Sequence, residues 1–470
     1  EGAFQQAFVP VLSEYRETQS RAALKNYVDH MFGTLAAMVF VVVGIGIIAA
    51  PLVIVLFAPG FGRDGEQFEL ATTMLWITFP YLFFISLTAF AASTLNTFER
   101  FAMPALAPIW LNISLIVATL IAAPLFAEPI MALAWGVFIA GILQLFFLLP
   151  FLARLGLLPR PRFGRHSGVK KTLKLMLPAM FGASVTQINL LIDTILASLL
   201  VAGSVSWLYY SDRLVELPLG VLGVAIATVI LPAMSRAFAT DNAVAYNRTL
   251  NGALKLTLLI GLPAMAGLIA LAVPILSTLF EYGAFTGHDT IMVALAMTAY
   301  ALGLPAFLLI KILAPGFFAR QDTATPVKIA LIAIGANLVF KAILLLPWFW
   351  FFEAQMAHIG LALTTALAAW VNAGLLGYTL KKRGAWISDQ DSWRFVSKIL
   401  ISALAMAAML FVLTPDHQTW QQWGGITRLT VLMGLIVTGV VLFLGLSALQ
   451  GQTPKKLVDV VLFDRKNRSI

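Results

Sequence analysis

Long, uninterrupted apolar stretches are the feature that most constrains how this 470-residue chain folds. A helix needs about 20 apolar residues to cross a bilayer, and twelve stretches of the chain meet this requirement. Continuous apolarity predicts helices, because the strands of a membrane barrel would alternate apolar and polar residues. The twelve predicted spans are residues 28–57, 70–95, 104–126, 130–152, 174–201, 205–234, 252–280, 290–318, 326–348, 357–380, 395–414 and 426–449.

The composition agrees with this prediction and excludes several classes of protein. Hydrophobic residues make up 60% of the chain and charged residues only 11%, whereas about 25% of an average soluble domain is charged. A soluble enzyme, a disordered chain and a nucleic-acid-binding domain are therefore excluded, although the net charge is +9. The sequence has no Cys, which excludes a disulfide framework and any Cys-based site.

The distribution of Lys and Arg predicts the orientation in the membrane. If the chain crosses at every predicted span, 26 of the 31 basic residues fall on one side and only Arg63 and Arg428 on the other. Basic residues stay on the cytoplasmic side, so both ends of the chain are predicted to be cytoplasmic. The positive charge therefore reflects topology and contact with anionic lipids rather than binding of nucleic acid.

An internal repeat is indicated by four prolines that recur in order, in similar local sequence, at a shift of about 222–225 residues: Pro10 and Pro232, Pro51 and Pro274, Pro80 and Pro305, Pro104 and Pro326. Parallel repeats are common in transporters. The second copy begins near Lys174, so the first copy lacks roughly two spans, and the complete protein is expected to have about fourteen.

The predicted fold is an all-α polytopic membrane protein with two six-helix lobes related by the repeat and two further C-terminal helices. Residues 1–152 form an incomplete N-lobe, residues 153–173 a basic cytoplasmic linker, and residues 174–383 the C-lobe. Residues 384–470 form the C-terminal helix pair and a basic tail.

Charged residues within predicted spans are candidates for function, because burying a charge in a bilayer is costly. Asp212, Arg213 and Glu216 lie near the middle of span 205–234, and Ser206 shares a helix face with Arg213. Arg213 and Glu216 are three residues apart and can touch. The functional interpretation is a cationic anchor for an anionic head group, since the Arg fork suits a diphosphate. The alternative is a local ion cluster that only holds helices together.

Three further charged residues in predicted spans each allow two interpretations. Asp193 and Lys341 are predicted at equal depth, where they would form a structural ion pair or a relay for a coupling ion. Lys311 lies about seven residues from the cytoplasmic end of its span. It would either extend to the interface or make a second anionic contact.

Other chemistry has little support in the sequence. The five His residues are scattered without metal-ligand spacing, so no metal site is predicted. No GxxxxGK[ST] motif occurs, so ATP is not the direct energy source. The acidic residues of the predicted outer loops, Glu281, Asp289 and Asp416 among them, are scattered without a DxD pattern.

Four segments carry a resemblance to a known family: EGAFQQAFVPVLSEY, FPYLFFISLTAFAASTLNTFERFAMPALAPIWLNIS, GSVSWLYYSDRLVELPLGVLGVAIATVILPAMS and KILAPGFFARQDTATPVKIA. They resemble the MurJ (MviN) family of lipid II flippases, within the multidrug/oligosaccharidyl-lipid/polysaccharide (MOP) exporter superfamily. The resemblance covers essentially the whole chain.

The resemblance implies two six-helix lobes around a cationic cavity, with the C-terminal helix pair forming a groove for the lipid tail. It implies alternating access that carries undecaprenyl-diphosphate-linked peptidoglycan precursor from the cytoplasmic to the periplasmic leaflet of the bacterial inner membrane. Ser206, Arg213 and Glu216 match residues that the family requires. Lipid II and membrane lipids, but not nucleic acid, are the expected partners of a monomer. Partners from cell-wall synthesis or division are not identified by the sequence. No cofactor is expected, and the membrane potential is the expected driver.

The chain departs from the family pattern in two places. The family's first helix and most of its second carry further required Arg and Asp residues, and this sequence begins after them, in agreement with the repeat. At the sodium site of some relatives, Asp193 and Asn337 match ligands, but Lys341 stands where a second acid is expected. We therefore expect no sodium binding there.

Three alternative functions are retained. A drug or cation antiporter, or another polysaccharide-lipid flippase, would belong to the same superfamily. A polytopic lipid-linked glycosyltransferase would need paired acids or a metal motif in the outer loops.

Overall fold

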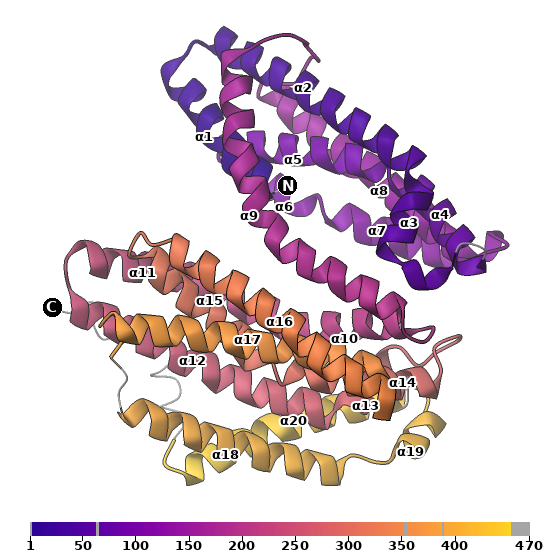
Figure 1. Cartoon of the computed structure of the whole chain (residues 1–470), viewed down its shortest axis with the longest axis vertical. Helices are drawn as coiled ribbons and strands as arrows, with labels where there is room; N and C mark the ends of the chain where they lie inside the picture. Colours follow the sequence, from indigo (N-terminus) through magenta and orange to yellow (C-terminus); the bar gives the residue numbers. More distant parts are fainter. Residues whose placement is uncertain (1, 63–64, 352–355, 388–389, 453–470) are drawn as a thin grey trace. The chain divides into compact units, whose positions relative to one another are not determined.

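The computed structural model describes residues 2–62, 65–351, 356–387 and 390–452, and every regular element in these ranges is a helix (Figure 1). Side chains are described except at residues 2–3, 178–179, 181–186, 222–229, 232, 345–351 and 390–391. The all-α class is confirmed. The chain divides into two compact units, Glu1–Leu199 (unit 1) and Leu200–Ile470 (unit 2).

Unit 1 contains the helices α1 (Gly2–Thr18), α2 (Arg21–Ile48), α3 (Ala50–Phe57), η1 (Pro59–Phe61), α4 (Glu66–Thr78), α5 (Tyr81–Thr97), α6 (Ala102–Leu106), α7 (Ile109–Val117), η2 (Ala118–Ala122), η3 (Ala123–Leu125), α8 (Ile130–Arg154) and α9 (Ser167–Ser198). Its core is aromatic, with Phe8, Tyr27 and Phe90 fully buried among α1, α2 and α5.

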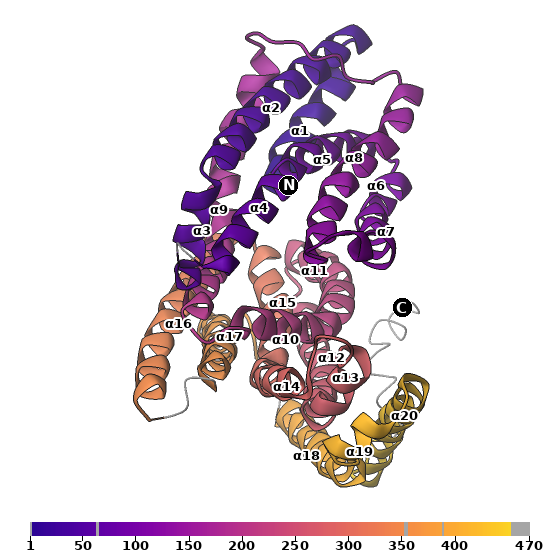
Figure 2. The ribbon, with the colours of Figure 1, turned by 90° about the vertical axis from the view of Figure 1, so that its right-hand side faces the viewer.

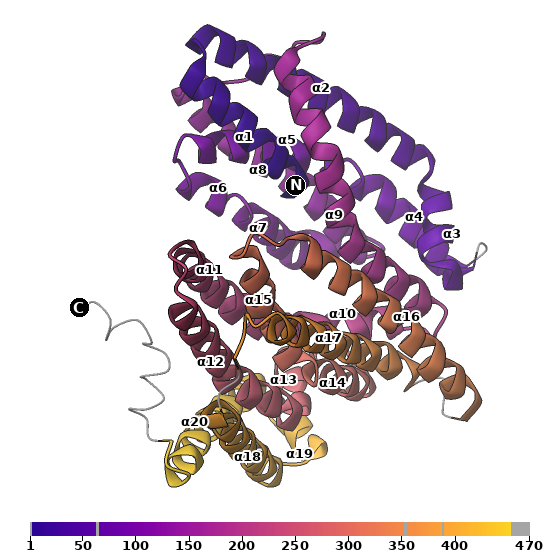
Figure 3. The ribbon, with the colours of Figure 1, turned by 60° about the vertical axis from the view of Figure 1, so that its left-hand side comes forward.

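The last helix of unit 1 follows the predicted linker. α9 packs on α1, α2 and α3, and α1 and α9 lie side by side in Figure 3. The compact units therefore divide after residue 199 rather than within 153–173, because α9 lies against helices that precede the linker. The lobe boundaries derived from the repeat remain a prediction.

Unit 2 contains α10 (Ser204–Pro218), η4 (Leu219–Gly223), α11 (Val224–Ala239), α12 (Ala243–Ala270), α13 (Ala272–Leu279), α14 (Gly287–Ala301), α15 (Leu304–Phe318), α16 (Ala324–Phe351), α17 (Ala357–Lys382), α18 (Gln390–Leu413), α19 (His417–Gln422) and α20 (Gly425–Leu449). α18 packs on α12 and α20, while α19 and α20 pack on α13. Figure 2 shows α18, α19 and α20 together at one edge of the unit.

Ten of the twelve predicted spans coincide with helices that are long and apolar enough to cross a membrane. The other two, 174–201 and 205–234, coincide with α9 and with α10–η4–α11, and both contain residues whose side chains lie outside the described set. The count of twelve therefore remains a prediction.

Several predicted spans are broken rather than continuous, and the breaks fall beside the repeated prolines. Pro51 follows the break between α2 and α3, and Pro305 follows the break between α14 and α15. A proline lacks the N–H that would continue the helical hydrogen bonds, so breaks of this kind are expected there.

Helix boundaries recur at the predicted shift. α2 and α12 both have 28 residues, α3 and α13 both have 8, and the starts within each pair lie 222 residues apart. Glu99 and Gln321, also 222 apart, both have positive φ values, of 60° and 61°. This correspondence supports the internal repeat, which stays a prediction.

Candidate substrate-binding site

The two faces of α10 divide cleanly by burial. Ser204, Leu208, Ser211 and Val215 recur at helical spacing and are buried, on the side that packs against α14 and α17. The opposite stripe is exposed and consists of Ser206, Tyr209, Arg213 and Glu216. The structure therefore brings the three predicted residues of this stripe together on one open face.

Arg213 and Glu216 form the ion pair that their spacing predicted. Nη1 of Arg213 lies 2.7 Å from Oε2 of Glu216, and the two side chains are 58% and 52% exposed. The guanidinium also lies 5.0 Å from the ring centre of Tyr209. An Arg has five N–H donors in a planar fork, so this pair leaves the cation able to bind a second anion. Asp212 is only half-buried and lies beside this stripe.

Tyr209 was not predicted from the sequence. Its position four residues before Arg213 places the two side chains on one face, and this spacing was the available signal. A ring beneath a guanidinium stabilises the cation and limits its orientations.

The helix changes geometry directly after this stripe. Pro218 ends α10, and residues Leu219–Gly223 form the π-helical turn η4 before α11 begins. Pro218 has no N–H for the preceding turn, and π-helical turns often occur at functional sites. The change from α-helix to π-helical turn at Leu219 lies within one turn of Glu216.

Trp207 holds α10 in place from its buried side. Its indole Nε1 donates to Oδ1 of Asp289 on α14 at 2.8 Å, and its ring contacts His358 and His288 at centroid distances of 5.0 and 5.7 Å. Trp207 is 5% exposed. The neighbouring residue, Ser206, is thereby kept on the open face.

The remaining predicted residues lie elsewhere. Lys311 is exposed on α15, and Asn337 and Lys341 are buried one turn apart on α16. Asp193 lies on α9 in unit 1, where Asn189 Nδ2 is 3.4 Å from its Oδ2. The predicted pair of Asp193 and Lys341 joins residues of different units and remains a prediction. No group of three or more metal-ligating His, Asp or Glu side chains occurs among the described residues.

Comparisons with known proteins decide the family. The family model described as "Lipid II flippase MurJ" matches residues 1–434. A probable lipid II flippase MurJ of Vibrio cholerae is 40% identical over 97% of this chain and 87% of its own length. A lipid II flippase MurJ of Burkholderia cenocepacia is 41% identical over 87% of this chain and 79% of its own length. The chain belongs to the MurJ family of lipid II flippases.

Solved structures agree with membership of the MurJ family. A lipid II flippase MurJ in an inward closed conformation matches with a TM-score of 0.79 and 27% identity, over 97% of this chain and 89% of that one. An inward-facing multidrug MATE transporter of the MOP superfamily matches with a TM-score of 0.66 and 17% identity, over 81% and 86%. The second match shows the fold alone. Membership of the MurJ family makes this chain a multi-pass membrane transporter rather than an enzyme.

Proposed function

We propose that this protein carries lipid II from the cytoplasmic to the periplasmic leaflet of the bacterial inner membrane by alternating access. Family membership supports the substrate, and the exposed pair of Arg213 and Glu216 on α10 is the observation that supports the site. A charged pair on the open face of a helix in a predicted membrane span is costly, and an anionic substrate gives it a use.

Arg213 is the proposed ligand of the diphosphate. Two of its N–H groups can bind phosphate oxygens in a fork, while Glu216 and Asp212 orient the guanidinium and Tyr209 supports it from below. Ser206 contributes a hydroxyl from the same stripe. Lys311 would make a second anionic contact from α15; the alternative, that it extends to the interface, remains open.

The lipid tail is proposed to lie beside the C-terminal helix pair. A cavity of about 430 Å³ lies between α18 and the helices α12, α15 and α17, and most of its lining residues are apolar. Gly374 lines this cavity, and an added Cβ there would meet no atom within 4 Å. An open apolar cavity suits a prenyl chain, because burial of hydrocarbon needs no polar partner.

The orientation and the energy source are also part of the proposal. Both chain ends lie in the cytoplasm, since basic residues gather on that side, and the membrane potential acts on the charge that moves. The chain acts as a monomer. Lys341 is proposed to take the place of a cation near Asp193, so no sodium ion is used.

The decisive experiment replaces Arg213 by Ala. Transport of lipid II should be abolished, measured as failure to support growth of a bacterium depleted of its own flippase. Arg213→Lys keeps the charge but not the fork and should restore only part of the transport. Arg394→Ala, at an exposed position of α18, is the matched control. Full growth with Arg213→Ala at normal protein levels would refute the assignment of the site.

A further inference from the structure

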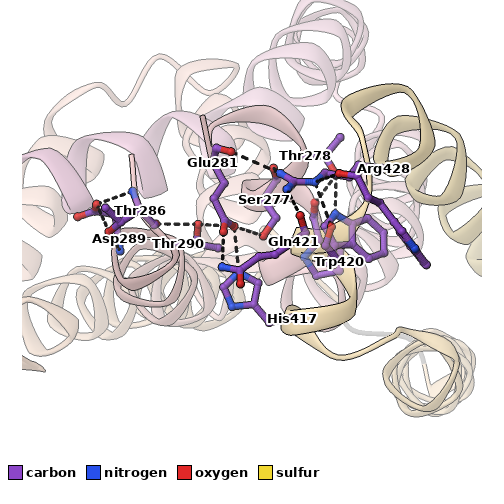
Figure 4. A network of polar contacts seen from close by, with 12 residues as sticks. Ser277, Thr278, Glu281, Thr286, Asp289, Thr290, His417, Trp420, Gln421 and Arg428 are labelled. Atoms are coloured by element: carbon purple, nitrogen blue, oxygen red, sulfur yellow. Dashed lines mark hydrogen bonds and ion pairs between the residues drawn. The ribbon is translucent and has the colours of Figure 1, made fainter. Parts of the chain in front are cut away.

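The C-terminal helix pair (α18 and α20, with α19 between them) is joined to the rest of unit 2 through Glu281 (Figure 4). This side chain is 8% exposed and lies in the connection between α13 and α14. Its carboxylate accepts hydrogen bonds from His417 Nε2 at 2.9 Å, Gln421 Nε2 at 2.5 Å, Ser277 Oγ at 2.5 Å and Thr290 Oγ1 at 2.9 Å. One carboxylate therefore joins α13, α14 and α19.

These donors keep Glu281 ionised. Burial opposes the charge, but the hydrogen bonds from His417, Ser277, Gln421 and Thr290 outweigh it and lower the pKa of Glu281 to about 2. Hydrogen bonds to the charged form favour that form. A neutral amide at this position would have one acceptor oxygen in place of two, so fewer of the four donors could bond to it.

Arg428 and Trp420 close the same junction. Arg428, in the first turn of α20, is 7% exposed and donates to the carbonyl oxygens of Ser277 at 2.9 Å and Gln421 at 3.0 Å. Trp420 is 1% exposed and donates to Oγ1 of Thr278 at 3.2 Å. Oriented polar contacts therefore fix the start of α20 to the end of α13.

Further contacts lead from Glu281 to α10, the helix that carries the candidate substrate-binding site. Thr290 lies beside Asp289 in the first turn of α14, where Thr286 Oγ1 donates to Asp289 Oδ2 at 2.7 Å. Asp289 Oδ1 accepts from Trp207 on α10 at 2.8 Å. A chain of contacts, made of these hydrogen bonds and the first turn of α14, thus runs from α19 to the helix that carries Arg213.

We propose that Glu281 is a positioning residue for transport, which couples the position of α10 to the docking of the C-terminal helix pair. The physical reason is directionality. A hydrogen bond weakens steeply when its partners move out of line, so a displacement of α10 breaks or shifts the chain, whereas an apolar contact would slide. Only the transport readout of this inference rests on the proposed function.

The first test measures docking directly. The sequence contains no Cys, so Leu217→Cys on α10 and Ile426→Cys on α20, which are 63% and 85% exposed in the parent, accept spin labels without background. Glu281→Gln is expected to broaden the distance distribution between the labels. An unchanged distribution would overturn the proposal.

Asp416→Asn is the matched control for this test. Asp416 is the N-cap of α19 and accepts a hydrogen bond from the backbone N–H of Thr419. It makes no contact with Glu281 among the hydrogen bonds above. Since Asn caps a helix about as well as Asp, the same change from carboxylate to amide should leave the distribution as in the parent. Broadening equal to that of Glu281→Gln would show that loss of charge alone suffices, against the proposal.

The second test separates positioning from binding. Glu281→Gln should lower the rate of lipid II transport in proteoliposomes about fivefold, in the range of coupling energies carried by such networks. The Kd for lipid II should change less than about twofold, because no substrate contact is lost. A larger loss of binding with an unchanged rate would contradict a positioning role.

Trp207→Phe interrupts the other end of the chain by removing only the indole N–H. It should reproduce both effects, and it keeps the proposal testable if Glu281→Gln fails to fold. The double variant should be no slower than either single variant, since one chain is broken only once. If the fold-reductions in transport rate of the two single variants multiply in the double variant, the proposed coupling is overturned. If the parent protein moves no lipid II, the proposed function fails, while the label distances still decide this inference.

Discussion

Replacing Arg428 by Met is expected to release α19 from the remainder of unit 2. Arg428 donates to the carbonyl oxygens of Ser277, Gln421, Trp420 and Trp423 at distances of 2.9 to 3.1 Å. Met fills much of the same space with a flexible apolar chain. The substitution therefore removes the hydrogen bonds and leaves the apolar packing largely in place.

The size of the effect follows from these contacts. A hydrogen bond from a charged group contributes about 1.5–3 kcal/mol, but contacts made by one side chain do not add. Buried carbonyl oxygens that lose their donor cost about 1–3 kcal/mol each, and we expect a total of about 3 kcal/mol. Since each 1.36 kcal/mol is a factor of ten, amides of α19 should exchange about 100-fold faster or more.

Hydrogen exchange read by mass spectrometry measures this effect on purified protein in lipid nanodiscs. The α19 segment His417–Gln422 should lose protection, while α17 should not change. Arg394→Met, on the exposed face of α18, is the control for loss of a positive charge. Exchange of α19 within about threefold of the parent would refute the anchoring role of Arg428.

Four further predictions concern other parts of the molecule. Asp29 is 3% exposed, forms an ion pair with Lys25 and accepts a hydrogen bond from the backbone N–H of Arg160 at 2.8 Å. Asp29→Asn should therefore loosen residues 157–165 and speed tryptic cleavage there about fivefold, as expected for a loss of about 1 kcal/mol. An unchanged cleavage rate would contradict this role of Asp29. Gly374→Leu should fill the apolar cavity beside α18 and slow lipid II transport. Gly434→Leu on α20, where an added Cβ also meets open space, should leave transport unchanged. Equal effects of the two substitutions would argue against a site for the lipid tail in this cavity. The pKa of Glu281 is depressed in the folded state to about 2 from its usual 4.5. The stability that its carboxylate contributes is therefore present above pH 4.5 and is lost as the pH falls toward 2. Spin labels at positions 217 and 426 should report separation of the C-terminal helix pair between these pH values, and constant distances would count against the role of Glu281. Transport should not require sodium, and sodium-dependent transport that is lost in Asp193→Ala but unaffected by replacing Lys341 would disprove the substitution of Lys341 for a cation.

Local spacing made α10 predictable. Ser206 and Arg213 are seven residues apart, and Arg213 and Glu216 are three apart, so the helical period alone places them on one face. The prolines were equally informative, because loss of a backbone N–H acts locally. The prolines indicate the repeat, whereas the breaks that they cause within the predicted spans are found only in the structure.

Contacts between distant segments could not be predicted in this way. The hydrogen bond between Glu281 and His417 joins residues 136 positions apart, and that between Arg428 and Ser277 joins residues 151 apart. Neither pair has a spacing that a helical period would reveal. The sequence places Arg428 on the outer side of the membrane, at the start of a predicted span, and only the packing of α20 on α13 shows that it is buried.

The packing around Glu281 also bears on the alternative that the protein is a lipid-linked glycosyltransferase. The acidic residues of the outer loops are scattered in the sequence, yet the fold brings Glu281 and Asp289 together at the first turn of α14, through Thr290 and Thr286. A general acid needs a pKa near the working pH, whereas the pKa of Glu281 is about 2 and its oxygens accept four hydrogen bonds. Asp289 accepts from Thr286 and Trp207 and is the third residue of the α14 capping box, whose N-cap is Thr286. Carboxylates that are this fully bonded hold helices in register, which is what a transporter that moves as packed helices requires.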